Sequence, residues 1–159
     1  MRLEEVLDRT LSALDALGYP AALLGGFGIS VWVDPRFTRD VDLAVAVESD
    51  EAAETLVHRL GAAGFTLLAT VEQKATGRLA TVRFAPPSEP QGGIVVDLLM
   101  ASSGLEREIV RDAATIDIGL GRPVPVARPG HLVALKLLSN DPKTRPQDAL
   151  DLHALRCFL

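Results

Sequence analysis

The sequence contains few aromatic residues and almost no cysteine. Aromatic residues make up 4% of the 159 positions, and Cys157 is the single cysteine. A platform for single-stranded nucleic acid stacks bases on several exposed aromatic rings, so this composition argues against one. One cysteine excludes an internal disulfide and a cysteine-rich metal site, and it fits a reducing, cytoplasmic compartment.

Long apolar runs and an excess of positive charge are also missing. No apolar run approaches the roughly 18 residues of a membrane span, and residues 1–8 carry three acidic side chains instead of the apolar region of a signal peptide. Lys and Arg number 16 against 21 Asp and Glu, a formal net charge of −5. This balance disfavours a broad phosphate-binding surface but leaves room for a small basic pocket.

Nearly half of the sequence, 48%, is hydrophobic, which predicts one domain over 1–159 with an aliphatic core. Apolar residues at helical spacing predict helices over 3–17, 27–33, 50–63, 105–113, 129–138 and from 146 onward. Apolar and β-branched runs predict strands over 21–24, 41–47, 65–71, 79–84, 94–100, 115–118 and 124–127. This order indicates an α+β fold in which helices flank one mixed β-sheet. The core spans 1–128, and a short helical segment follows over 129–159.

A glycine pair, Gly25-Gly26, separates the expected strand 21–24 from the expected helix 27–33. Glycine lets the backbone approach a ligand closely, and the N-terminus of a helix attracts phosphate. A Gly-Gly pair is also an ordinary tight turn, so both interpretations stay open at this point.

Two aspartates, Asp40 and Asp42, stand at the start of the apolar strand 41–47. Alternate strand residues share a face, and two carboxylates about 7 Å apart on one face repel each other unless a cation lies between them. Carboxylate oxygens are ligands that suit Mg²⁺. The alternative is a solvated strand start, where aspartate is common.

A third aspartate, Asp97, interrupts the apolar run 94–100. A carboxylate is costly to bury in so apolar a strand, so it needs a partner, a metal or an exposed face. If this strand lies beside the strand of Asp40 and Asp42, three carboxylates converge. Three converging carboxylates are what a two-metal site for phosphoryl or nucleotidyl transfer requires.

In this order, Gly25-Gly26, Asp40-Val41-Asp42 and Asp97 resemble the nucleotidyltransferase superfamily with the DNA polymerase β-like catalytic fold. Its pattern is a glycine-rich turn at a strand end, then Asp-x-Asp, then a third Asp on a neighbouring strand. The stretches 25–28 and 36–43 are most similar to the bacterial AbiEii/MenT-like nucleotidyltransferases, which include toxins of toxin–antitoxin pairs.

Members of that branch also carry a Lys on a later helix and an Arg and two Asp residues on the next. Lys136, Arg145, Asp148 and Asp151 match these positions. Asp148 and Asp151 are three residues apart, so they share a helix face on which they could pair with Lys136 or Arg145. A solvated helix face is the alternative, favoured for Asp151.

The resemblance implies a metal site and a nucleotide site. Asp40 and Asp42 would hold two Mg²⁺ ions, with Mn²⁺ as a substitute, and Asp97 would complete the site and help deprotonate the acceptor. The implied nucleotide-binding residues are Gly25, Gly26, Arg36, Thr38, Arg39, Lys136 and Asp148. Arg39 has the alternative of pairing with Asp40.

The implied activity moves a nucleoside monophosphate from an NTP such as ATP to a hydroxyl, with a tRNA or other RNA end or a protein as acceptor. A cognate antitoxin is the implied partner. The alternatives are a small-molecule transferase of the aminoglycoside type and a catalytically silent nucleotide-binding module. A small basic pocket for the acceptor has six candidate arginines: Arg78, Arg83, Arg107, Arg111, Arg122 and Arg128.

The three histidines are given ordinary interpretations. His58 is expected at the surface, and His131 at a helix start is unremarkable. His153 has two aspartates near it in sequence, which is a weak case for a metal site.

Overall fold

The computed structural model describes residues 2–35, 37–72, 79–89, 92–100, 104–139 and 146–158. Arg36, Arg78 and the expected break over 140–145 lie outside these residues. None of the described helices is both long enough and apolar enough to cross a membrane.

One seven-stranded mixed sheet organises the chain, which confirms the predicted α+β class. Its strand order is β3-β4-β5-β2-β1-β7-β6. The strands are β1 (Ala21–Leu24), β2 (Asp40–Val45), β3 (Thr66–Glu72), β4 (Leu79–Ala85), β5 (Val95–Met100), β6 (Ala114–Asp117) and β7 (Pro123–Val126). Strand β2 at the centre is antiparallel to β1 and parallel to β5.

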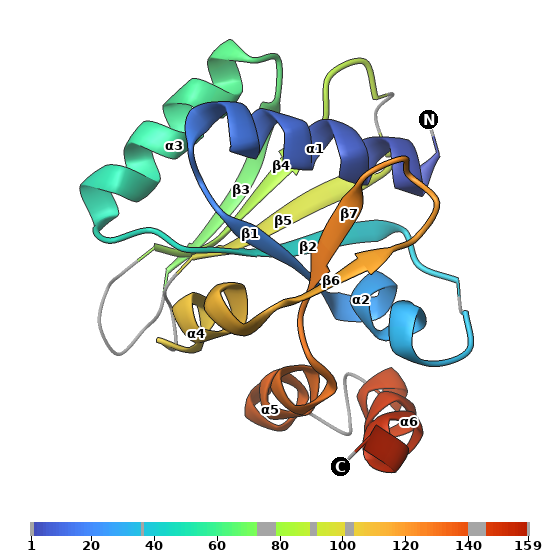
Figure 1. The fold of residues 1–159 in the computed structure, drawn as a ribbon. Coiled ribbons are helices and arrows are strands. Elements are labelled where there is room, and N and C mark those ends of the chain that lie inside the picture. Colours follow the sequence, from blue (N-terminus) through green and yellow to red (C-terminus); the bar gives the residue numbers. More distant parts are fainter. Residues whose placement is uncertain are drawn as a thin grey trace.

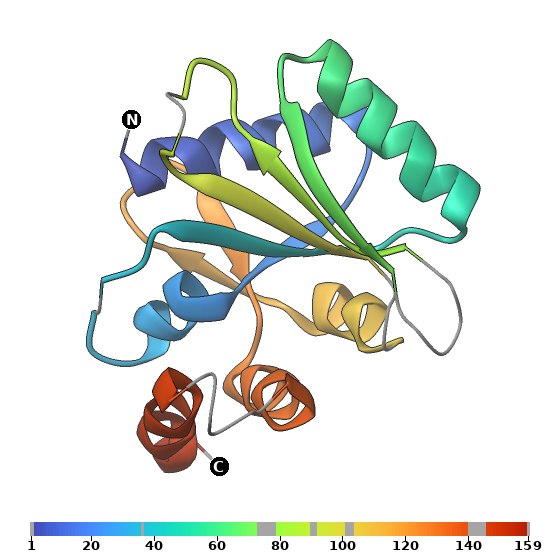
Figure 2. The same ribbon diagram turned by 180° about the vertical axis from the view of Figure 1, so that it is seen from behind.

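Helices cover both faces of the sheet. They are α1 (Leu3–Leu17), α2 (Gly25–Trp32), α3 (Asp50–Ala62), α4 (Leu105–Asp112), α5 (Pro129–Ser139) and α6 (Pro146–Leu155), followed by a 3₁₀ turn, η1 (Arg156–Phe158). Helices α1 and α3 lie on one face, and α2 and α4 lie on the other with α5 and α6 below them (Figure 1). The view from behind shows the same two layers (Figure 2).

The alternation of side chains along each strand builds two separate cores. Leu43 and Leu98 point to the layer of α1 and α3, whereas Ala44 on β2 packs with Ile109 of α4 and Leu132 of α5. Because Asp42 and Ala44 are two residues apart, the side chain of Asp42 lies on the α2, α4 and α5 side. The sheet therefore directs its aspartates into the layer that contains the C-terminal helices.

Local signals fix most of the element ends. Gly18 ends α1 in the left-handed conformation at φ 82°, and the Ser49 side chain accepts a hydrogen bond from the Ala52 backbone N–H at 3.1 Å to cap α3. Most boundaries differ from the prediction by one or two residues, and two of these differences affect the site. Helix α2 begins at Gly25, two residues early, because the glycine pair forms its first turn, and β2 already includes Asp40.

Candidate active site

The register of β2 and β5 brings the three strand aspartates together. Asp42 is the direct partner of Asp97 across the parallel pair, and Asp40 lies two residues before Asp42 on the same face. Asp97 is 8% exposed. The sequence could only state this convergence conditionally, since it depends on which strand lies beside β2.

A cation from the next strand engages the third aspartate. Arg83 of β4 is the register partner of Asp97, so Arg83, Asp97 and Asp42 form one row across three strands. The Arg83 guanidinium donates from Nε to Oδ1 and from Nη2 to Oδ2 of Asp97, both at 2.8 Å. Each oxygen of Asp97 thus accepts one hydrogen bond from Arg83 and keeps a lone pair for another partner, and the oxygens of the three aspartates do not all lie within 4.8 Å of one another.

Burial and like charge make this group a poor place for three anions. Burial, together with the neighbouring charges of Asp97 and Asp40, raises the pKa of Asp42 to about 7. The pKa of Asp40 is also raised, first by burial and then by Asp97. A cation placed beside these two carboxylates would favour their ionised forms.

Gly25 is required by its packing against Asp42. Its φ is +62°, a conformation that other residues rarely adopt. A Cβ atom added at Gly25 would lie 2.0 Å from Oδ2 and 2.8 Å from Cγ of Asp42. The first glycine of the pair therefore serves the aspartate site as well as the turn into α2.

A buried ion cluster on the C-terminal helices lies beside the aspartates. Lys136 of α5 donates to Oδ1 of Asp148 at 2.5 Å and approaches Oδ2 of Asp151 at 3.2 Å. The Asp148 and Asp151 side chains are 5% and 3% exposed. Both aspartates therefore pair with Lys136, one of the two interpretations left open, and the solvated helix face favoured for Asp151 is wrong because its side chain is buried. An ammonium group has three donors, so two carboxylates leave one for an anionic ligand.

An open cavity of about 220 Å³ lies between the two acidic groups. Asp42 and Lys136 provide its polar lining, and the rest is aliphatic or glycine: Leu24, Gly25, Ile29, Leu99, Leu132 and Leu135. Clefts that bury a whole drug-sized ligand measure about 300–1,000 Å³. This cavity has room for one part of a nucleotide, with charged groups at hand for phosphate.

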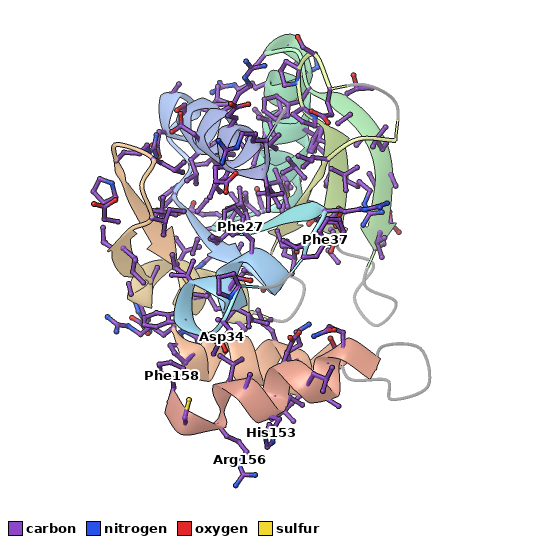
Figure 3. All side chains as sticks on the ribbon, turned by 90° about the vertical axis from the view of Figure 1, so that its right-hand side faces the viewer. Phe27, Asp34, Phe37, His153, Arg156 and Phe158 are labelled. Atoms are coloured by element: carbon purple, nitrogen blue, oxygen red, sulfur yellow. The ribbon has the colours of Figure 1, made fainter. Side chains whose placement is uncertain are left out.

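Two residues that were expected to bind the nucleotide, Thr38 and Arg39, do not line this cavity. Arg39 is exposed, and its guanidinium lies 5.4 Å from the centre of the Phe37 ring. It does not line the cavity, and it contacts Phe37 instead of forming the alternative ion pair with Asp40. Phe37 projects outward beside the start of β2 (Figure 3). Thr38 is half-buried beside them. His153 is exposed and lies on the outer side of α6 (Figure 3). This position does not favour the metal site considered for it.

The arginines expected near an acceptor pocket do not gather in one place. Arg83 engages Asp97, and Arg122 pairs with Asp15 of α1 at 2.6 Å. Arg111 binds Asp112, and Arg128 donates to the Asp112 backbone carbonyl at 2.6 Å. Arg111 and Arg128 thus meet at Asp112, whereas Arg83 and Arg122 are engaged on other elements, so these four arginines do not line one pocket.

Residues 7–156 match the family described as nucleotidyl transferase AbiEii toxin, type IV TA system. The chain belongs to this AbiEii nucleotidyltransferase family. Its activity is therefore transfer of a nucleoside monophosphate, and the family implies an NTP as substrate and an antitoxin as partner. No curated relative matches the sequence.

Solved structures share the fold of this AbiEii nucleotidyltransferase at low identity. An antigenic nucleotidyltransferase-like protein from Paracoccidioides brasiliensis has 20% identity and a TM-score of 0.59, with 96% of this chain and 75% of that chain covered. The lincosamide antibiotic adenylyltransferase LnuA has 13% identity and a TM-score of 0.58, covering 98% of both chains. The antibiotic-resistance factor ANT(2″)-Ia has 17% identity and a TM-score of 0.59, covering 98% and 82%.

Replacing Gly25 tests how the turn supports Asp42. Gly25→Ala should destabilise the AbiEii nucleotidyltransferase by at least about 1–2 kcal/mol, because φ is positive and the new methyl group collides with the Asp42 carboxylate. The matched control is Gly61→Ala in α3, where an added Cβ atom meets nothing within 4 Å. This variant should be more stable than wild type by up to about 1 kcal/mol, because alanine favours the helix over glycine. Urea denaturation measures both, and equal stability of the two variants would contradict the packing argument.

The raised pKa of Asp42 predicts a pH-dependent stability without divalent ions. Its pKa is about 7 in the folded protein and about 3.9 in an unfolded chain, so the folded state binds the proton more tightly. Stability should fall as pH rises from about 4 to about 7, by at most about 4 kcal/mol from this group. Melting temperatures measured in EDTA should show this slope, and Asp42→Asn should flatten it. An unchanged slope in the variant would assign the titration to other groups.

Proposed function

We propose that this chain is a magnesium-dependent nucleotidyltransferase whose metal ligands and catalytic residues are Asp40, Asp42 and Asp97. The observation that carries the proposal is the direct register of Asp42 and Asp97, with Asp40 on the same face and Lys136 across the cavity. We also propose that residues 1–128 form the catalytic core and that the helices of 129–159 complete the site with Lys136.

The donor set fits magnesium. Three carboxylates offer only oxygen atoms, which hard cations such as Mg²⁺ prefer, and Mg²⁺ is commonly held by one or two carboxylates plus substrate phosphates. Burial and the charges of Asp97 and Asp40 raise the pKa of Asp42, and a bound cation would offset both effects. Bound metal supplies charge neutralisation at the phosphates and lowers the pKa of the attacking hydroxyl.

The protein's own groups then have distinct tasks. Lys136 binds a triphosphate oxygen with its remaining donor, held in place by Asp148. The backbone of Gly25 and Gly26 lies at the start of α2, where N–H groups favour phosphate, and Thr38 and Arg39 directly precede β2. Asp97 takes the proton of the acceptor hydroxyl. The hydroxyl oxygen bonds to the α-phosphorus, the bond from that phosphorus to the bridging oxygen breaks, and pyrophosphate leaves.

The proposed acceptor is a hydroxyl on an RNA end, such as tRNA, or on a protein. The family description as a toxin supports a cellular macromolecule as target, with an antitoxin as the controlling partner. The net charge of −5 and the dispersed arginines favour a short contact at one hydroxyl over a long nucleic-acid surface. A small-molecule acceptor of the antibiotic type is a separate outcome of the same assay.

The activity is tested by following label from each of the four NTPs, with Mg²⁺ and with total tRNA, cell protein or an aminoglycoside as acceptor. Asp40→Asn and Asp42→Asn should each lose at least about 100-fold in rate, since even outer partners of a metal ligand cost 10–100-fold. The control is Asp8→Asn on α1, at the opposite face of the sheet, which should retain the wild-type rate. Wild-type turnover in either strand variant would reject the metal assignment.

The pairing of Arg83 with Asp97 predicts competition between a guanidinium and the metal. Arg83→Gln frees both Asp97 oxygens and removes a positive charge. In EDTA at pH 8 the variant should therefore melt lower than wild type, and the stabilisation by Mg²⁺ should be larger. Arg122→Gln, which breaks an exposed pair with Asp15, is the control and should leave the Mg²⁺ response unchanged. A smaller Mg²⁺ response in Arg83→Gln would instead mean that Arg83 must hold Asp97 for the metal.

A further inference from the structure

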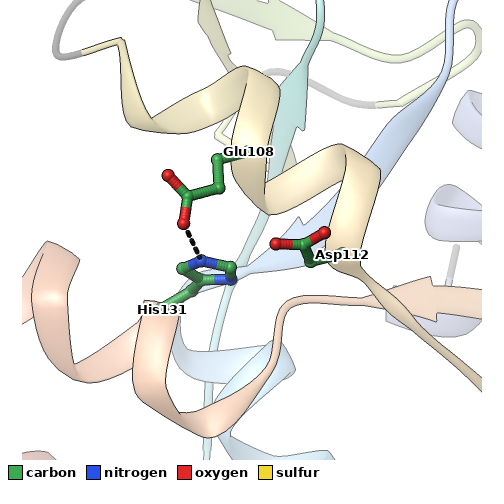
Figure 4. A group of neighbouring side chains, drawn as sticks. All are labelled: Glu108, Asp112 and His131. Atoms are coloured by element: carbon green, nitrogen blue, oxygen red, sulfur yellow. Dashed lines mark hydrogen bonds and ion pairs between the residues drawn. The ribbon is translucent and has the colours of Figure 1, made fainter.

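A second group of ligand-type side chains lies where α4 meets α5. Glu108 and Asp112 are four residues apart on α4, so they share a helix face, and His131 faces them from the first turn of α5 (Figure 4). One ligand atom from each lies within 4.8 Å of the other two. Within the described part of the chain, this is the one trio of His, Cys, Asp or Glu that meets this limit.

The separation of His131 from Glu108 matches two ligands of one ion. Nε2 of His131 is 3.3 Å from Oε1 of Glu108, which is long for an N–H···O bond of about 2.7–3.2 Å. Ligands bonded at about 2.0–2.1 Å to a tetrahedral ion lie about 3.3 Å apart. The pair therefore already has the spacing of neighbouring zinc ligands.

The imidazole of His131 has coordinating capacity that no described residue uses. Its side chain is 16% exposed, and its buried Nδ1 has no hydrogen-bond partner among the described residues. A buried ring nitrogen without a partner loses its hydrogen bond to water and gains none in return. Because no partner of Nδ1 fixes the tautomer, the single lone pair of the neutral imidazole can lie on Nε2, the nitrogen that faces Glu108 and would bind the ion.

The backbone around the trio is held in place without an ion. Arg128, just before α5, donates from Nε to the backbone carbonyl of Asp112 at 2.6 Å. This bond fixes the end of α4 against the start of α5, so the three side chains meet across a joint that already exists. Only side-chain adjustment would be needed to bring them to one centre.

We propose that Glu108, Asp112 and His131 bind a divalent transition-metal ion of the zinc class and that this ion links α4 to α5. Imidazole with carboxylates suits Zn²⁺ and its neighbours, whereas Mg²⁺ prefers oxygen ligands alone. The strand aspartates and this trio would therefore select different metals. This site is separate from the proposed magnesium site and does not depend on it.

Arg111 is the competitor for this site. Its guanidinium binds both oxygens of Asp112, at 2.9 and 3.1 Å, and lowers the pKa of that carboxyl. The pair is exposed, with side chains 70% and 39% accessible, and exposed pairs contribute little. Asp112 is thus an ionised ligand that an incoming cation can take over, and Arg111→Gln should tighten metal binding.

The test is Zn²⁺ binding by equilibrium dialysis in excess Mg²⁺, which occupies the all-oxygen site. Every protein carries Cys157→Ser, because the Cys157 thiol is exposed and would itself bind zinc. The parent should bind one Zn²⁺ per chain and melt at least about 5 °C higher at saturation. His131→Ala and Glu108→Gln should each weaken binding at least 10-fold, since outer partners of a ligand alone cost that much.

The control is His153→Ala, which removes an exposed imidazole on α6 and should bind zinc like the parent. Glu108 is half-exposed, so Glu108→Gln keeps the test valid even if His131→Ala folds poorly. Zinc binding that persists unchanged in Glu108→Gln would overturn the proposal, and so would the absence of zinc binding by the parent. Repeating the titration in Asp42→Asn separates the two sites, because loss of the magnesium site should leave zinc binding intact.

Discussion

The sheet holds several carboxylates side by side, and these carboxylates repel one another. The arrangement of the other charged groups in the site depends on this repulsion. The parallel register of β2 and β5 makes Asp42 and Asp97 direct neighbours, and burial removes the water that would otherwise screen them. Two cations from other elements reduce the repulsion, Arg83 from β4 and Lys136 from α5. Asp148 and Asp151 bring five carboxylates against these two cations, which leaves a charge deficit that divalent ions would fill.

Strand register is therefore a functional constraint as well as a structural one. A slip of one residue between β2 and β5 would turn Asp97 to the opposite face, into the core under α1 and α3. The aliphatic residues around Asp97 prevent such a slip, because Val96 and Leu98 are fully buried on that other face. The apolar pattern of β5 thus holds the aspartate in position while also forming the sheet.

Alternation and spacing made much of this architecture readable from the sequence. Asp40 and Asp42 lie on one face of the sheet because strand side chains alternate between the two faces. Asp148 and Asp151 can reach the same lysine because their spacing places them on one face of a helix. The partner of Asp97 could not be read in this way. Arg83 is 14 residues away on a strand whose neighbour is set by the whole sheet, so its pairing is a tertiary fact.

The same reason explains why His131 looked ordinary in the sequence. Glu108 and Asp112 have ligand spacing on their own helix, but their third member stands 19 residues beyond Asp112 and meets them only because α4 and α5 cross. Gly25 shows an intermediate case. The sequence indicated a turn or a phosphate contact there, whereas the structure adds the steric demand of the Asp42 carboxylate.

Helix α5 connects these features through the geometry of a single helix. His131 and Lys136 are five residues apart, which places them about 140° apart around the axis. One side chain therefore faces α4 while the other reaches the aspartates of α6, and Leu132 and Leu135 between them line the cavity. Contacts on two sides restrict both the rotation and the sliding of α5. The position of the Lys136 ammonium relative to Asp42 is thus set by the polar contacts at both ends of this segment, since the apolar residues between them would tolerate small shifts.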